Sequence, residues 1–386
     1  MTMNNLLYVR WESYLRDDIA EALKTLSDSV FTIDIKIDGY KIDSKYEELI
    51  QNTIVEKKFE AVFTINYIPE VSNLCKKYHI KYISWTYDAP CAMLYDKSAK
   101  NKCNYIYTFD RNVVDELLKE GIENVYYMPL ASSKVFIKTD ESKPIDFRYD
   151  ISFVGSTYEK MLNMYNQCMA AFPDYLKGYL KSVIDSQLLL DGSYILEDTI
   201  SIEVENQLKS ILNLDLGEGY LKSYKSFFAN YVLGAKTTAL QREGILNLLS
   251  SHFNVDLFTG DYNKETLSQK IVIHKPVSYG EELAKIYQSS KINLNITMAN
   301  IQQGIPLRVF DIMGSGGFVM TNYRPGLENH FIDGEDLVVY YDRMDLINKV
   351  EYYLLHDEER KTIAENGRKK IKSEYTVDKR IREIFM

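Results

Sequence analysis

The chain has 386 residues, of which 46% are hydrophobic and 26% are charged, and its formal net charge is −9. These values predict a soluble globular protein with room for two domains, and they argue against a general nucleic-acid surface. No apolar run reaches the roughly 18 residues of a membrane span, and the N-terminus lacks the pattern of a secretory signal. We therefore expect a cytoplasmic protein that binds no nucleic acid and has no transmembrane segment.

The cysteines show no metal-binding or disulfide pattern. Cys75, Cys91, Cys103 and Cys168 form no CxxC pair, and no histidine lies near them at metal-ligand spacing. Reduced thiols are the expected state, and neither a metal nor another cofactor is expected.

Strand and helix patterns alternate through the first third of the chain. Short runs rich in β-branched and aromatic residues predict strands, and the segments between them have helical apolar spacing. Strands separated by helices of about ten residues imply a parallel sheet that is covered on both faces. Strands are expected at 6–9, 31–37, 61–65, 81–85, 105–109 and 125–128, and helices at 17–26, 46–57, 70–78 and 112–120.

Proline, serine and charged residues concentrate at 129–148, which indicates a domain boundary. A second strand-and-helix region follows, interrupted by a long segment of helical pattern. The expected organisation is a first domain at 1–135, a linker at 136–148, a second domain at 149–365 with a helical insertion at about 158–250, and a C-terminal helix at 366–386 that packs on the first domain. Within the second domain, strands are expected at 150–154, 255–260, 271–274, 292–296 and 318–321, and a helix at 280–289.

The most informative segment follows the strand at 292–296. It contains Gly304 and Pro306 and continues with helical spacing through Arg308 and Asp311. A strand, a glycine turn and a helix with proline in its first turn form an anion-binding arrangement, because the free amides and the helix dipole favour a phosphate. Arg308 could add a forked donor, and Asp311 would lie about 10 Å farther along the helix than Gly304. Most such turns in α/β proteins bind no ligand, so a purely structural turn also fits this pattern.

Taken together, these segments resemble the GT-B glycosyltransferases. Residues 303–311 have the E-x7-E spacing of the retaining enzymes of that fold. Residues 85–90, 153–156, 308–311 and 314–317 resemble the bacterial spore-maturation-type glycosyltransferases of the group 1/4-like families. The resemblance implies an α/β protein with two Rossmann-like domains facing a cleft. The acceptor site would lie in the first domain and the donor site in the second.

The resemblance also implies roles for the residues of the central segment. Asp311 would bind the ribose hydroxyls of the donor, and a carboxylate suits two neighbouring O–H donors. Gln303 would lie against the donor sugar, where the family pattern has an acid. Gly304, Ile305 and Pro306 would present amides to the diphosphate.

Other donor residues are expected at the remaining turns of the second domain. Gly155 and Ser156 would face the same phosphates, and Lys236 and Arg242 would clamp them unless they are solvated charges on a helix face. Tyr279 would stack on the base, although a surface aromatic fits equally.

Two acids of the first domain are candidate catalytic residues. Asp88 follows a strand, and Tyr87 precedes it where many GT-B enzymes have histidine. Asp88 could orient the acceptor or remove its proton, or it could simply cap the next segment. Glu12, after the first strand, is a second candidate base.

The implied function is metal-independent transfer of a hexosyl or N-acetylhexosaminyl group. The donor would be a nucleoside diphosphate sugar, with UDP expected first, and the acceptor a hydroxyl on a protein or glycan. The spacing of 303–311 favours retention of configuration, whereas the amide of Gln303 leaves inversion open, with Asp88 or Glu12 as base. A GT-B nucleotide-sugar epimerase and a non-catalytic module that binds nucleotide sugars or glycans are the alternatives.

Overall fold

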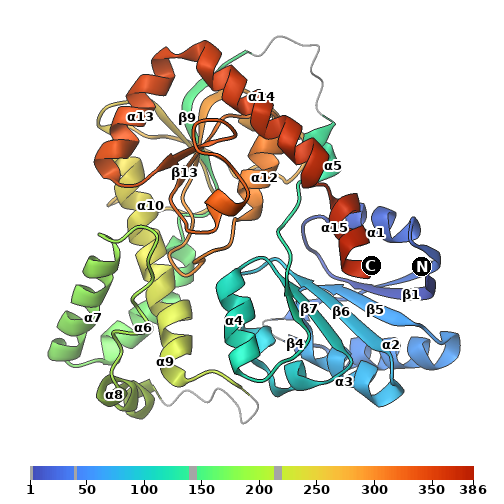
Figure 1. Cartoon of the computed structure of the whole chain (residues 1–386). Coiled ribbons are helices and arrows are strands. Elements are labelled where there is room, and N and C mark those ends of the chain that lie inside the picture. The colour runs from blue at the N-terminus through green and yellow to red at the C-terminus, as the bar shows by residue number, and fades with distance from the viewer. Residues whose placement is uncertain (1–2, 39–40, 139–145, 213–219) are drawn as a thin grey trace. The chain divides into compact units, whose positions relative to one another are not determined.

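The computed structural model describes residues 3–38, 41–138, 146–212 and 220–386, which form two compact units. Figure 1 shows the course of the chain through both. Unit 1 consists of Met1–Lys134, Leu216–Lys222 and Glu374–Met386, and unit 2 consists of Val135–Asp215 and Ser223–Ser373. The predicted α/β class is confirmed in both units.

Unit 1 is built on a six-stranded sheet in the order β2-β1-β5-β6-β7-β8, in which every pairing is parallel. All five residues of β5 are buried, as expected for a central strand with helices on both faces. The strands are β1 (Met3–Arg10), β2 (Ser27–Asp34), β5 (Ala61–Ile65), β6 (Lys81–Thr86), β7 (Asn104–Thr108) and β8 (Val125–Tyr127), with a small antiparallel pair, β3 (Ile37–Asp38) and β4 (Lys41–Ile42). The helices are α1 (Arg16–Lys24), α2 (Ser44–Lys57), α3 (Pro69–Tyr78), α4 (Arg111–Lys119) and α15 (Val377–Phe385), with 3-10 turns η1 (Ala92–Tyr95) and η2 (Lys97–Lys100).

The C-terminal helix belongs to the core of unit 1. Ile381 and Ile384 of α15 are buried, and the hydroxyl of Tyr107 donates to the carbonyl of Ile384 over 3.1 Å. The helix expected at 366–386 is divided in two, because Thr376 caps a new helix through its hydroxyl, which accepts from the amide of Lys379. The residues before that break end α14 (Asp357–Glu374) and lie in unit 2 as far as Ser373.

Unit 2 has a second six-stranded parallel sheet, in the order β11-β10-β9-β12-β13-β14. Numbered within the sheet this is 3-2-1-4-5-6, the order of the dinucleotide-binding fold. The strand β14 and the helix α13 beside it were not among the predicted elements. The elements are β9 (Tyr149–Val154), β10 (Val255–Phe258), β11 (Val272–His274), β12 (Ser290–Asn295), β13 (Val319–Asn322), β14 (Val338–Tyr340), α11 (Glu281–Gln288), α12 (Leu307–Gly314), η5 (Leu327–Asn329) and α13 (Arg343–Leu355).

The long connection between β9 and β10 is helical, as predicted, and ends in α10 (Gly234–Ser250), which packs against the sheet. A short stretch of this connection departs from the expected domain assignment, because residues 220–222 belong to unit 1. There the amide of Leu221 donates to the carbonyl of Tyr95, and Lys222 pairs with Glu116 at 2.8 Å. The other elements of the insertion are η3 (Glu159–Leu162), α6 (Asn163–Ala171), α7 (Asp174–Gln187), α8 (Ile202–Leu212), α9 (Tyr224–Phe227) and a π-helical stretch, η4 (Phe228–Leu233).

The expected linker at 136–148 begins inside unit 2. The short helix α5 (Lys134–Ile137) carries Phe136, whose side chain is fully buried and packs edge-on against Tyr279 with ring centroids 5.1 Å apart. Phe136 is therefore a core residue rather than part of a linker. Residues 139–145 lie outside the described residues.

Candidate functional site

The two sheets each have one place where the strand order reverses, and such switch points leave a crevice at the carboxyl ends of the strands. In unit 2 the reversal lies at β9 and β12, and in unit 1 at β1 and β5. Most of the residues singled out from the sequence follow these strands or their immediate neighbours. The parallel sheets thus gather them at one edge of each unit.

Gly155 ends β9 with a backbone that only glycine adopts without strain. Its φ angle is +150°, and its amide donates to the carbonyl of Phe258 over 3.0 Å. A Cβ atom there would lie 2.5 Å from Nη2 of Arg308 and 3.3 Å from its Cζ. The absence of a side chain lets the guanidinium of Arg308 lie directly against the turn.

Arg308 is the second residue of α12. Its Nη1 donates to Oδ1 of Asn295 over 3.1 Å, and its Cζ lies 5.0 Å from the ring centroid of Phe153. Asn295, at the end of β12, is in turn held by Thr297 and Thr321, each of which accepts from its Nδ2. Arg308 is therefore anchored by a neutral amide, and no described carboxylate forms an ion pair with it.

Arg242 approaches the same edge from α10 and is 5% exposed. Its two Nη atoms donate to the carbonyls of Ser156 (2.6 Å) and Ile296 (3.0 Å), which follow β9 and β12. Burial, together with the charge of Arg308, lowers the pKa of Arg242 to about 9. Arg242 is thus not a solvated charge on a helix face: it ties the two loops together and adds positive charge beside Arg308.

Ser156 is used within the same loop. Its hydroxyl donates to Oδ2 of Asp261 over 2.9 Å and accepts from the amide of Tyr158. Although burial alone would raise the pKa of Asp261, hydrogen bonds from Ser156 and the amide of Thr157 hold it below its ordinary value. Asp261 was not among the predicted residues, and its position after the 255–260 strand was the only signal for it.

The helix α12 starts later than predicted. Pro306 is its N-cap, with an extended ψ of 150°, and Leu307 is the first helical residue. Proline also disfavours helical geometry in the residue before it, so Gly304 and Ile305 lie outside the helix. Asp311 is accordingly only four residues, or about 6 Å, from the helix start. The amide of Val309 donates to the carbonyl of Pro306 over 3.0 Å, so the free amides at the helix start are those of Leu307 and Arg308, next to the Gly155 loop.

Of the remaining residues of this segment, Asp311 lies on α12, and Gln303, Gly304 and Ile305 lie in the loop before it. Asp311 is 2% exposed on α12, Gly304 and Ile305 are buried, and Gln303 is half-buried. A Cβ on Gly326 would overlap the carbonyl oxygen of Gln303, so the backbone of the loop lies directly against Gly326. The roles expected for Gln303 and Asp311 remain predictions.

Lys236 and Tyr279 lie against neighbouring aromatic residues. Lys236 and Arg242 are six residues apart on α10, which turns the helix by about 240° between them. Lys236 does not share the face of Arg242, and its Nζ lies 5.5 Å from the ring centroid of Tyr165. Tyr279 packs edge-on against Phe136 and is half-buried rather than a free surface aromatic.

A third arginine at this edge was not predicted. Arg324, after β13, is 2% exposed and donates to the carbonyls of Thr297 (3.0 Å) and Tyr323 (3.1 Å). Burial raises the pKa of Asp191 in the insertion, while the charge of Arg324 opposes the rise. In the sequence, the polar residues 322–324 after a strand were the available sign that Arg324 lies at this site. The helical pattern around Asp191 gave no such sign.

In unit 1, Asp88 is held by a residue that the sequence did not single out. Asn66, after β5, has a positive φ of 58°, and its Nδ2 donates to Oδ2 of Asp88 over 2.6 Å. Its Oδ1 accepts from the amides of Tyr87 and Asp88. Loss of hydration raises the pKa of Asp88, and the bond from Asn66 opposes the rise. Cys91 is the N-cap residue of the next helical turn, η1, so Asp88 does not cap that turn.

Glu12 follows β1 and its side chain is exposed. The preceding residue is fixed, because Nε1 of Trp11 donates to the carbonyl of Ile65 over 2.8 Å. Trp11 therefore joins the ends of β1 and β5 at the switch point, and this hydrogen bond fixes the backbone position of the adjacent Glu12. Within the residues that the structure describes, Glu12 has no hydrogen-bond or ion-pair partner.

Across the described ranges, no three His, Cys, Asp or Glu side chains are grouped so that they could hold a metal ion. No helix in those ranges is both long enough and apolar enough to cross a membrane.

We compared the sequence and the fold with those of known proteins. Residues 241–386 match the family model described as glycosyl transferase-like. No curated protein matches the sequence. Among solved structures, a glycosyltransferase from Rickettsia africae is 12% identical with a TM-score of 0.54, covering 100% of this chain and 97% of that chain. The Anabaena HepE protein in complex with UDP is 10% identical with a TM-score of 0.58, covering 99% and 98%. The T4 phage BGT protein in complex with its UDP-glucose substrate is 12% identical with a TM-score of 0.51, again covering 99% and 98%. At these identities the likeness shows the fold, and it extends through both units.

Proposed function

From the GT-B fold of the whole chain and the glycosyl transferase-like family of its residues 241–386, we propose that this protein is a glycosyltransferase. It uses a nucleoside diphosphate sugar as donor and transfers the sugar to a hydroxyl group. UDP is the nucleotide we expect first, because two proteins of the same fold are described in complex with UDP or UDP-glucose.

The observation that carries the proposal is the arginine pair at the switch point of unit 2. Arg308 lies against the Gly155 turn. Arg242, on α10, adds a second positive charge beside Arg308. Neither guanidinium forms an ion pair with a carboxylate of the described residues. Uncompensated positive charge at the start of a helix is the environment that a diphosphate requires.

The same arrangement supplies chemistry as well as binding. When the bond from sugar to diphosphate breaks, negative charge grows on the leaving phosphate. Arg308 and the first amides of α12 are already in place to stabilise it, so no reorganisation is needed at that moment. We propose that this fixed charge replaces a metal ion.

The remaining roles are proposed from the sequence resemblance. Asp311 binds the ribose, Gly304, Ile305 and Pro306 present backbone to the diphosphate, and Gln303 contacts the sugar. The transfer retains configuration and moves a hexosyl or N-acetylhexosaminyl group to a protein or glycan. Asp88 orients the acceptor or takes its proton, which its raised pKa favours because a raised pKa makes a carboxylate a stronger base.

A two-stage screen tests this function. Thermal shift with a panel of nucleoside diphosphates and their sugars identifies the donor. Mass spectrometry then follows free sugar and glycosylated acceptors. Stabilisation by a nucleoside diphosphate with sugar release or transfer supports the proposal, and stabilisation without any turnover would identify a binding module instead.

A further inference from the structure

A pocket on the opposite edge of the unit 2 sheet is not used by the proposed reaction. It lies where β9, β12 and β13 begin, and Phe147, Ser290 and Phe318 among its lining residues precede or start these strands. Since β12 rises by about 3.3 Å per residue, the pocket is about 17 Å from the Arg308 edge. Its volume is about 390 Å³, which is the size of a small-ligand site.

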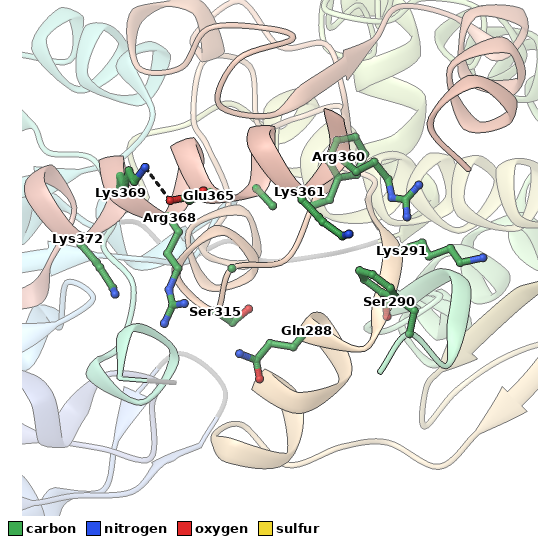
Figure 2. A pocket seen from close by; sticks show the side chains of 14 residues that line it. Gln288, Ser290, Lys291, Ser315, Arg360, Lys361, Glu365, Arg368, Lys369 and Lys372 are labelled. Atoms are coloured by element: carbon green, nitrogen blue, oxygen red, sulfur yellow. Dashed lines mark ion pairs between the residues drawn. The ribbon is translucent and has the colours of Figure 1, made fainter. Parts of the chain in front are cut away.

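The lining of this pocket is strongly basic. Glu365 is the one acid among the lining residues, against six cations: Lys291, Arg360, Lys361, Arg368, Lys369 and Lys372. Figure 2 shows Lys361 and Arg368 extending from α14 on the side where Gln288 and Ser315 lie, while Lys369 pairs with Glu365 on the other side. The hollow between α14 and the ends of α11 and α12 is thus lined by cationic groups.

Part of this charge has a structural explanation. The helices α11 and α12 end here at Gln288 and Gly314, and their terminal carbonyls favour nearby cations. Arg368 packs beside the end of α12, because a Cβ on Gly316 would lie 3.3 Å from its Cδ, and its Nη2 donates to the carbonyl of Ile137 over 3.3 Å. Helix ends do not account for the hollow itself, nor for Arg360.

Arg360 is a buried cation with an unused donor. Its side chain is 2% exposed, Nη2 donates to Asp357 over 2.6 Å, and Nη1 donates to the carbonyl of Tyr353. Its Nε is buried and has no hydrogen-bond partner among the described residues. Because this N–H is buried, a ligand in the pocket does not reach it. Arg360 contributes to the pocket through its charge and through its packing on Phe147, whose ring centroid lies 5.7 Å from Cζ.

Lys361 is the cation of the pocket whose partner is easiest to replace, whereas Lys291 is held by Asp150 at 2.7 Å with both side chains about one-third exposed. Lys361 pairs with Glu358 at 2.6 Å, yet the two side chains are 49% and 88% exposed. Such an exposed pair contributes little to stability and exchanges readily for a stronger anionic partner. The pocket also has apolar walls, formed by Phe147, Phe318 and Ala364.

We propose that this pocket binds a small organic phosphate whose apolar group packs against Phe147 and Phe318. The phosphate oxygens pair with Lys361 and with the cations on the neighbouring turns of α14. This site is separate from the donor site and does not depend on the proposed transfer reaction.

Calorimetry with phenyl phosphate as probe tests the affinity. Inorganic phosphate, which carries only the anionic group, and benzyl alcohol, which carries only the aromatic group, are the two half-probes. We expect one phenyl phosphate per chain in the pocket, bound at least fivefold more tightly than either half-probe. In Lys361→Gln/Lys372→Gln the affinity falls at least tenfold. The control Lys177→Gln/Lys181→Gln removes two cations of α7 that also pair within their own helix, and it leaves the affinity unchanged.

Hydrogen–deuterium exchange locates the probe on the full chain. Protection by phenyl phosphate is expected at 357–373 and 315–318, and it persists in Arg308→Gln. Absent binding, protection confined to 155–160 and 304–311, or equal affinity in the two double variants, would overturn the proposal.

Discussion

Arg308 and Arg242 are chemically alike but have different tasks. Both Nη atoms of Arg242 are engaged by backbone carbonyls, so this side chain holds the loops after β9 and β12 in place. Arg308 makes a side-chain hydrogen bond to Asn295 and lies against Gly155, where the backbone leaves room. Loss of Arg242 should therefore disturb the loops after β9 and β12, whereas loss of Arg308 should mainly lower the affinity for the ligand.

Asp311 is predicted to bind the ribose of the donor. We expect Asp311→Ala to weaken nucleotide binding at least tenfold, about 1.4 kcal/mol, because charge-assisted hydrogen bonds are lost. Calorimetry with UDP measures the change. Because Asp311 is 2% exposed, Asp311→Asn is the control for packing, and circular dichroism checks both folds. Unchanged affinity in folded Asp311→Ala would remove the ribose assignment.

Asp88 gives a prediction that depends on pH. Its folded pKa is raised, so the native state keeps the proton over a range where the unfolded chain has already lost it. Native stability from this group is present at low pH and decreases as pH rises from the ordinary pKa of about 3.9 to the raised value. At pH 7 the ionised carboxylate of Asp88 therefore lowers the free energy of unfolding.

Asp88→Asn should consequently unfold at an equal or higher urea concentration than the wild type at pH 7, while transfer falls sharply. The Asn66 hydrogen bond can persist with an amide oxygen as acceptor. Urea titrations at pH 4 and pH 7, combined with the transfer assay, separate the two effects. Full transfer activity in Asp88→Asn would exclude a catalytic role.

At the level of helices and strands, most of the architecture was predictable, because each strand is a short β-branched or aromatic run between helical patterns. Strand β5, for example, lies at the predicted residues, Ala61–Ile65. The start of α12 lies after the predicted one because Pro306 disfavours helical geometry in the residue before it. The break before α15 depends on one capping hydroxyl, which is indistinguishable from a surface threonine in the sequence.

The candidate site was predictable where glycine and charge fall at strand ends, as at Gly155 and Arg308. It was not predictable where a side chain reaches the site through the tertiary fold. Asn66, Asp261 and Arg324 are ordinary loop residues in the sequence, and only the parallel register of the sheets brings them to the carboxyl edge. The separation of Lys236 from Arg242 likewise depends on which face of α10 packs on the sheet.

The helix α15 should contribute strongly to the stability of unit 1. Ile381 is completely buried, so Ile381→Ala should destabilise this unit by about 2–5 kcal/mol through lost packing and a residual cavity. Both tryptophans, Trp11 and Trp85, lie in unit 1, so urea unfolding followed by tryptophan fluorescence reports on it directly. The exposed position Lys379 of the same helix supplies the control, Lys379→Ala, which should shift the midpoint little. Equal midpoints for the two variants would contradict this view of α15.

For the molecule as a whole, the net charge of −9 opposes anionic donors in general, so local positive charge must select them. If the arginine edge supplies that charge without a metal, sugar transfer should be unchanged after dialysis against EDTA. Adding Mg²⁺ or Mn²⁺ afterwards should raise the rate less than twofold. Loss of activity in EDTA with recovery on metal addition would contradict the metal-independent mechanism.

The most direct test of the nucleotide-sugar site is calorimetric titration of UDP into three forms of the full chain. The wild type should bind one UDP, Arg308→Gln should bind it at least tenfold more weakly, and Lys181→Gln, which removes an exposed ion pair of α7, should bind it as the wild type does. Should UDP and the other nucleoside diphosphates fail to bind the wild type, or should UDP bind Arg308→Gln as tightly as the wild type, the proposed donor site would be contradicted.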